Sequence, residues 1–166
     1  MTQTRPFWVA GKPVTSDEVS EIRSPYDGDL VATLSIPTAG DVEAAVSAAD
    51  AVQPEAMATT AAQRAAALMH VSEQITARAD EIARLITAEN GKPLMWSRIE
   101  ATRGASTFRW AAEEARRWSG ELQRLDTDPT STGRMGLVRR FPYGPVLGIA
   151  PFNFPLNLVA HKVAPA

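Results

Sequence analysis

Cysteine is absent from the 166 residues of the chain. That absence excludes a disulfide framework, a thiolate metal site and a cysteine nucleophile supplied by this chain. Histidine is nearly absent too, because only His70 and His161 occur and they lie far apart in the sequence. A histidine-based metal cluster needs several ligands close together, so we expect no metal site.

Strong net charge and long apolar segments are also missing. The formal net charge of −2 gives no electrostatic reason to expect binding to nucleic acid or to an anionic membrane surface. No apolar run approaches the ~20 residues that span a bilayer, and residues 1–5 lack the apolar core of a secretory signal. We therefore expect no membrane association and, by default, a cytoplasmic location.

What is present is the composition of an ordinary globular protein, with 45% apolar and 22% charged residues. A chain of 166 residues can bury one core and is short for two domains. Residues 4–35 have β character, and within them the dipeptide Asp27-Gly28 is typical of a hairpin turn. Apolar residues alternate in the segment 30–36 that follows, which predicts a half-buried strand after the turn.

Helical periodicity follows from residue 38 to about residue 118. Thr38 with an acidic first turn and the capping-box pattern of residues 60–63 predict two helix starts. Gly91, with Pro93 just beyond it, predicts a helix end. The last helix is predicted over about 94–118, with these apolar positions facing inward: Met95, Ile99, Phe108, Ala112 and Ala115.

The pattern changes again after a polar loop at residues 126–133. Residues 134–141 resemble a strand, and the short apolar run 146–150 is typical of a parallel strand buried on both faces. Residues 156–163 are helical in pattern, with Pro155 suited to the first turn. This order predicts the first unit of a doubly wound α/β domain. Because the last residues are apolar and uncapped, we expect the chain to end within a domain.

Asn153 is the residue most suited to chemistry. It follows the predicted parallel strand, at the sheet edge where open α/β folds bind ligands. If Pro155 is the first helical residue, Asn153 lies too early to cap the helix, so its amide is available to stabilise an oxyanion. Position alone favours a structural alternative, in which the side chain closes an Asx turn. For Glu89 and Lys92 the nearby helix end also offers an explanation without function.

Several segments resemble the aldehyde dehydrogenase superfamily, in the order and spacing of that family. The most specific is the Pro-Phe-Asn-Phe-Pro element at residues 151–155, and the resemblance covers essentially the whole chain. The similar segments are SPYDG at residues 24–28, ENGKPL at 89–94, FPYGPVLGIAPFNFPLNL at 141–158 and HKVAPA at 161–166.

The resemblance implies an α/β fold made of a cofactor-binding domain and an oligomerisation hairpin. It places residues 1–121 in the N-terminal part of the cofactor-binding domain and residues 122–142 in the hairpin arm. Residues 143–166 would form the first β–α unit of the Rossmann-like sheet. In the family the arm joins a partner subunit's sheet, so we expect a homo-oligomer, either a dimer or a tetramer.

The resemblance also implies an activity and its site. The family oxidises aldehydes to carboxylic acids with NAD or NADP through a cysteine thiohemiacetal and thioester. Asn153 matches the asparagine that holds the oxyanion in this family. The positions that match the nicotinamide side of the cofactor cleft are Ile149, Ala150, Pro151 and Phe152.

The catalytic cysteine, the glutamate base and the lysine near the adenosine ribose lie downstream in the family and have no counterpart here. We therefore expect an N-terminal segment of an NAD(P)-dependent aldehyde dehydrogenase that acts on a small aldehyde and is inactive by itself. The alternative is a free-standing, non-catalytic module that associates with dehydrogenase subunits through the hairpin arm.

Overall fold

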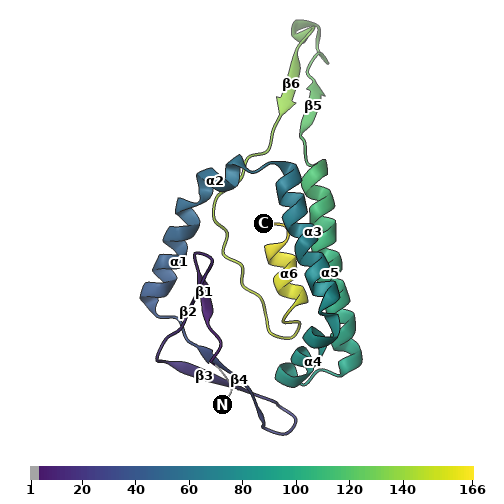
Figure 1. The fold of residues 1–166 in the computed structure, drawn as a ribbon. Helices are drawn as coiled ribbons and strands as arrows, with labels where there is room; N and C mark the ends of the chain where they lie inside the picture. Colours follow the sequence, from purple (N-terminus) through teal and green to yellow (C-terminus); the bar gives the residue numbers. More distant parts are fainter. Residues whose placement is uncertain (1–3) are drawn as a thin grey trace.

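A computed structural model describes residues 4–166 of the chain. The chain forms a β-rich N-terminal region, a group of packed helices and a projecting arm, and after the arm the last helix returns to the packed group (Figure 1). The strands are β1 (Phe7–Val9), β2 (Lys12–Val14), β3 (Val19–Arg23), β4 (Leu30–Ser35), β5 (Glu121–Arg124) and β6 (Met135–Val138). The helices are α1 (Ala39–Ala51), α2 (Gln53–Ala58), α3 (Ala61–Ala77), α4 (Ala79–Asn90), α5 (Leu94–Arg117), the 3-10 turn η1 (Pro129–Ser131) and α6 (Asn157–Val163). The expected mixture of helices and strands is confirmed.

The N-terminal region consists of two antiparallel hairpins, β1–β2 and β3–β4. The predicted Asp-Gly turn joins β3 to β4, and Gly28 adopts the left-handed φ of 80° that such turns require. The carboxylate of Asp27 accepts a hydrogen bond from the backbone N–H of Asp29 at 3.1 Å. This bond closes the turn locally, and the predicted hairpin is confirmed.

Both predicted helix starts are present. The hydroxyl of Thr38 accepts from the N–H of Asp41, whose carboxylate accepts from the N–H of Thr38, so a complete capping box opens α1. Thr60 and Gln63 form the same reciprocal pair at the start of α3. Each box gives partners to backbone N–H groups that have none inside the helix.

The main core lies where α3 packs along α5, with α4 and α6 also against α5 (Figure 1). Its buried members are Ile75, Ala105, Phe108, Ala160 and Ala164. The prediction of the inward face of α5 holds only in part. Phe108 and Ala112 are buried, whereas Met95 and Ile99 are 60% and 44% exposed.

Gly104 lies in the buried face of α5, where α6 approaches it closely. A Cβ at this position would lie 3.0 Å from the side chain of Leu156. The absence of a side chain at residue 104 therefore lets the segment before α6 pack directly on α5.

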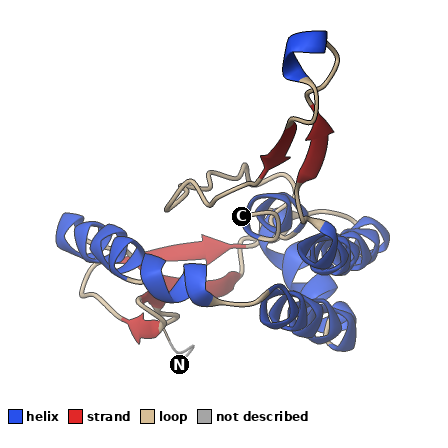
Figure 2. Cartoon of the chain, turned by 90° about the horizontal axis from the view of Figure 1, so that it is seen from above, coloured by secondary structure: helices blue, strands red, loops and turns tan. Residues whose placement is uncertain are grey.

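The arm consists of β5 and β6, which pair antiparallel from Glu121 opposite Val138 to Arg124 opposite Met135. It extends beyond the helices with η1 near its tip (Figure 2). Most of its side chains are exposed, including the apolar Leu122 and Leu137. The hairpin predicted for this segment is thus present, and its apolar faces are uncovered within residues 4–166.

The predicted parallel strand over residues 146–150 is wrong for this chain. The segment carries no strand, and Leu147 and Ile149 are 85% and 75% exposed. A parallel strand takes its backbone hydrogen bonds from neighbouring strands, and all sheets within residues 4–166 are antiparallel pairs formed elsewhere. The apolar run therefore lies as extended backbone that leads to α6.

Helix α6 also begins later than predicted. Leu156 is its N-cap and Asn157 its first residue, so Pro155 precedes the helix and does not open it. In the part of the chain that the structure describes, none of the helices combines the length and the apolar character needed to cross a bilayer.

Candidate functional site

The candidate site is the loop of residues 151–156, which leads into α6 and lies against the turn between α4 and α5. That turn forms because Gly91 ends α4 with a left-handed φ of 74° and donates its N–H to the carbonyl of Thr87. The reversal brings Asn90 and Lys92 to face the loop, more than 60 residues away in the sequence.

Lys92 is the centre of the contacts between this turn and the loop. Its Nζ lies 2.5 Å from Oε2 of Glu100 and donates to the backbone carbonyl of Asn153 at 2.8 Å. The same ammonium lies 3.8 Å from the centre of the Phe154 ring, which is a cation–π contact. The side chain is only 11% exposed, so these partners replace most of its contact with solvent. The sequence-based interpretation of Lys92 as a simple helix-end residue is incomplete.

Glu100 fixes the other end of the loop. Its side chain is fully buried, and Oε1 accepts the backbone N–H groups of Leu156 at 3.0 Å and Asn157 at 3.2 Å. The first N–H groups of a helix have no partner inside it, and a carboxylate is the favoured acceptor at this positive end. One carboxylate therefore binds the Lys92 ammonium and the start of α6 together.

A third contact completes the hold on the loop. The side-chain amide of Asn90 donates to the carbonyl of Phe152 at 2.9 Å. The carbonyls of Phe152 and Asn153 are thus both occupied by donors from the α4–α5 turn. The backbone of the loop is held on both sides of Asn153 by side chains distant in sequence.

The side chain of Asn153 is exposed, and within residues 4–166 Asn153 takes part in hydrogen bonding only through its backbone carbonyl. The Asx turn considered from the sequence does not form here. A primary amide has two N–H donors, so Asn153 presents unused donors on a backbone that is fixed.

The positions predicted to line the nicotinamide side of a cofactor cleft precede Asn153 directly. Ile149, Pro151 and Phe152 are exposed and Ala150 is half-buried. They form an apolar stretch that stops at the polar Asn153. Among the described residues, no group of three acidic or histidine side chains is arranged to hold a metal ion.

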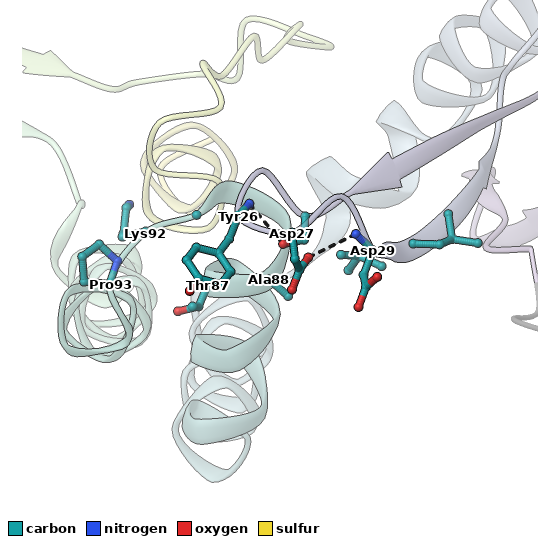
Figure 3. A pocket seen from close by; sticks show the side chains of 11 residues that line it. Tyr26, Asp27, Asp29, Thr87, Ala88, Lys92 and Pro93 are labelled. Atoms are coloured by element: carbon teal, nitrogen blue, oxygen red, sulfur yellow. Dashed lines mark hydrogen bonds between the residues drawn. The ribbon is translucent and has the colours of Figure 1, made fainter.

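Two of the distinctive sequence segments meet at a cavity of about 530 Å³ beside Lys92 (Figure 3). A Cβ on Gly91 would lie 2.8 Å from Cγ of Pro25, so the helix end and the β3–β4 turn are in close contact. Hydrogen bonds from Ser24 and from the Asp29 backbone hold the pKa of Asp27, which lines the cavity, below its ordinary value.

Glu89 lies half-buried next to the same turn. Burial raises the pKa of its carboxyl, and the nearby charge of Glu100 raises it further. The Glu100 carboxylate therefore disfavours the ionisation of Glu89, and the Lys92 ammonium pairs directly with Glu100.

Lys92 also lines a second, smaller cavity of about 300 Å³. It is lined by Lys92, Trp96, Ile99, Glu100, Arg103 and Phe154. Arg103 forms no ion pair within residues 4–166. The cavity thus combines apolar walls with one cation that has no acidic partner in the described chain.

Glu100 and Asn90 are functional candidates that the sequence analysis did not identify. Glu100 has a visible signal, because it lies in register with the small residues Ser97, Ala101 and Gly104 on one helix face. A carboxylate inside a stripe of small residues indicates a buried ionic partner. Asn90 carries no such signal, since an asparagine at a helix end is ordinary.

Three comparisons with known proteins agree with one another. A sequence model of the aldehyde dehydrogenase family matches residues 8–166. A sulfoacetaldehyde dehydrogenase from Neptuniibacter caesariensis is 40% identical over 108 residues, which are 65% of this chain and 24% of that protein. The crystal structure of aldehyde dehydrogenase 21 from Physcomitrella patens, in complex with the reaction product succinate, is 40% identical with a TM-score of 0.94, over 99% of this chain and 34% of that one.

A second solved structure is similar over the same extent. It is the NADP-dependent glyceraldehyde-3-phosphate dehydrogenase from Bacillus halodurans C-125 complexed with NADP, at 29% identity and a TM-score of 0.91. The match covers 99% of this chain and 35% of that protein. The chain therefore spans about a quarter to a third of the length of these proteins.

Proposed function

The chain belongs to the aldehyde dehydrogenase family, and on that premise we propose that it forms one wall of the active site of an enzyme that oxidises an aldehyde to a carboxylic acid. Asn153 is the residue of this wall that acts on the substrate. Its exposed amide stabilises the negative charge that develops on the aldehyde oxygen when a nucleophile adds to the carbonyl carbon.

One observation carries the role of Asn153. The loop backbone is fixed by Asn90, Lys92 and Glu100, while the Asn153 side chain has no hydrogen-bonding partner within residues 4–166. A donor that is held in place before the reaction needs no reorganisation when charge develops, which is the condition for effective electrostatic catalysis. The cysteine nucleophile of the family is supplied by residues outside this cysteine-free chain.

The cofactor of the proposed reaction is NAD or NADP, which supplies the hydride acceptor when it is bound. The apolar segment of residues 149–152 is exposed except for the half-buried Ala150, and it is followed by the polar amide of Asn153, so it fits one face of a flat heteroaromatic ring. These residues position the ring and exclude water from it. The NADP complex of the similar glyceraldehyde-3-phosphate dehydrogenase supports this choice.

For the substrate we propose a small aldehyde that carries a negative charge. Arg103 lines the cavity next to Phe154 and is available for a carboxylate or sulfonate group. Two similar proteins support this choice. One is named for sulfoacetaldehyde, which carries a sulfonate, and the other is in complex with the reaction product succinate, which carries carboxylates.

For the assembly we propose residues 1–121 and 143–166 as parts of the cofactor-binding domain and residues 122–142 as an oligomerisation arm. The exposed apolar side chains of β5 and β6 favour a homo-oligomer, dimer or tetramer, in which the arm extends a partner's sheet. We place the enzyme in the cytoplasm.

The test is Asn153→Ala in the complete protein that contains these residues, assayed by aldehyde-dependent formation of NADH or NADPH. We expect kcat to fall roughly 100-fold or more while the affinity for the cofactor stays close to wild type. Gln74→Ala, which removes an exposed amide on α3, is the matched control. A wild-type kcat in Asn153→Ala would rule out the proposed role.

The second candidate is a non-catalytic module that binds dehydrogenase subunits through the arm. It is favoured by the exposed apolar arm in a chain without cysteine. Aldehyde oxidation by the complete protein argues against this candidate, whereas an inactive protein that co-purifies with an active dehydrogenase supports it.

A further inference from the structure

We propose that Lys92 is the positioning residue for Asn153, acting through the buried ion pair with Glu100; this inference rests on the proposed role of Asn153. The observation is the three-way contact of one ammonium with the Glu100 carboxylate, the Asn153 carbonyl and the Phe154 ring. In this arrangement Lys92 acts through the backbone of the catalytic residue.

The contacts hold the backbone of the loop at separate positions before, at and after Asn153. Before Asn153, the Asn90 amide holds the carbonyl of Phe152, and after it, the Glu100 carboxylate holds the N–H of Leu156. At Asn153 itself the only hydrogen bond within residues 4–166 is the one from Lys92. The direction of that peptide group, and hence the direction of the Asn153 side chain, is set by the ammonium.

A lysine suits this task because it has three donors and no acceptor. Two of them are used by Glu100 and Asn153, and the third side of the ammonium faces the aromatic ring. Glu100, in turn, is fully buried, so it keeps the ammonium at one place and prevents it from reaching solvent. The ion pair of Lys92 and Glu100 therefore fixes the position of the oxyanion donor relative to α5.

The importance of this position follows from the geometry of catalysis. A misplacement of about 1 Å can lower a rate roughly 100-fold, and an oxyanion donor acts only at hydrogen-bond distance from the charged oxygen. A purely structural role of the pair would lower stability and leave the kcat of the folded enzyme unchanged. The two roles are thus separable by kinetics.

The experiment uses the complete protein and a double-mutant cycle with Asn153→Ala. The first variant is Lys92→Met, which keeps the length of the side chain and removes its donors. Because this leaves a buried carboxylate without its partner, the second variant is the pair Lys92→Met/Glu100→Gln, which has no buried charge. In Glu100→Gln the side-chain oxygen can still accept from Leu156. Lys12→Met, at an exposed lysine of β2, is the matched control.

We expect the uncharged pair to lower kcat about 10- to 100-fold, with the cofactor affinity and the fraction of folded protein close to wild type. In the Asn153→Ala background the same pair should lower kcat by less than about 2-fold. Chymotrypsin should also cleave the loop faster after Phe152 in the uncharged pair, because the loop is released; the bond after Phe154 resists the protease because Pro155 follows it.

Each contrary result has its own meaning. An unchanged kcat in the uncharged pair, or an equal loss with and without Asn153, overturns the positioning role. Unchanged cleavage of the loop overturns it as well, whatever the kinetics. A wild-type kcat in Asn153→Ala alone refutes the oxyanion role on which the inference rests, and that failure is recognised in the single variant.

Discussion

Replacing Glu100 with alanine should release the first turn of α6. The Glu100 carboxylate accepts the N–H groups of Leu156 and Asn157 at 3.0 and 3.2 Å and also binds the Lys92 ammonium. Its removal leaves these backbone donors and a nearly buried charge without their acceptor. Helix α6 contributes Ala160 to the main core, so the effect starts at its N-terminus and is limited by the packing behind it.

The magnitude follows from the kind of bond that is lost. A hydrogen bond to a charged acceptor contributes about 1.5–3 kcal/mol, which corresponds to roughly 10- to 150-fold in an opening equilibrium. Hydrogen exchange reports this equilibrium residue by residue. The amides of Leu156 and Asn157 should therefore exchange roughly 10- to 150-fold faster in Glu100→Ala.

Two matched variants make the measurement specific. Glu100→Gln keeps an oxygen at the same distance along the side chain, so the protection of Leu156 and Asn157 should be largely retained. Glu113→Ala removes an exposed glutamate from the same helix and should leave the loop unchanged. Exchange by mass spectrometry on the complete protein gives the comparison, and unaltered rates at both amides in Glu100→Ala would refute the reasoning.

Two further substitutions test the surroundings of the site. Burial and the charge of Glu100 raise the pKa of Glu89 above its ordinary 4.5, so this carboxyl weakens the folded state increasingly as the pH rises through its raised pKa. Glu89→Gln should accordingly raise the Tm at neutral pH and leave it unchanged below about pH 4, and an equal shift at both pH values would contradict this origin. Gly91→Ala should lower the free energy of unfolding by more than the roughly 1–2 kcal/mol of a left-handed alanine, because its Cβ meets Pro25 at 2.8 Å. Gly11→Ala is the control, since Gly11 has the same φ of 74° with nothing within 4 Å, and equal losses in denaturant titrations would exclude the contact with Pro25.

The local parts of the fold were accessible from the sequence because their causes lie within a few residues. The capping residues Thr38 and Thr60 and the helix end at Gly91 were predicted and are present. Each depends on hydrogen bonds or backbone conformations that a short segment determines by itself. The β3–β4 turn belongs to the same class.

The hold on the Asn153 loop was not accessible in this way. Asn153 could be identified from its segment, but its fixation depends on Lys92 and Glu100, which are 61 and 53 residues distant in the sequence. A glutamate in a helix is usually solvated, and only its register with the small residues around Ala101 indicates burial. The pairing of buried charges is a property of the packed structure.

At residues 146–150 the apolar pattern alone was not enough to predict the structure. Its apolar run has the composition of a strand covered on both faces, yet Leu147 is 85% exposed and the segment pairs with nothing in residues 4–166. Composition specifies what a strand can bury, whereas its hydrogen bonds come from neighbours that these residues do not supply.

In the complete protein, neighbouring strands should pair with the segment, and the amides of residues 146–150 should exchange at least about 100-fold more slowly than in the 166-residue chain alone. The chain alone should also aggregate, because it exposes the run together with the arm. Fast exchange in both proteins, or a monomeric 166-residue chain with a sharp melting transition, would show that the segment is not a latent strand.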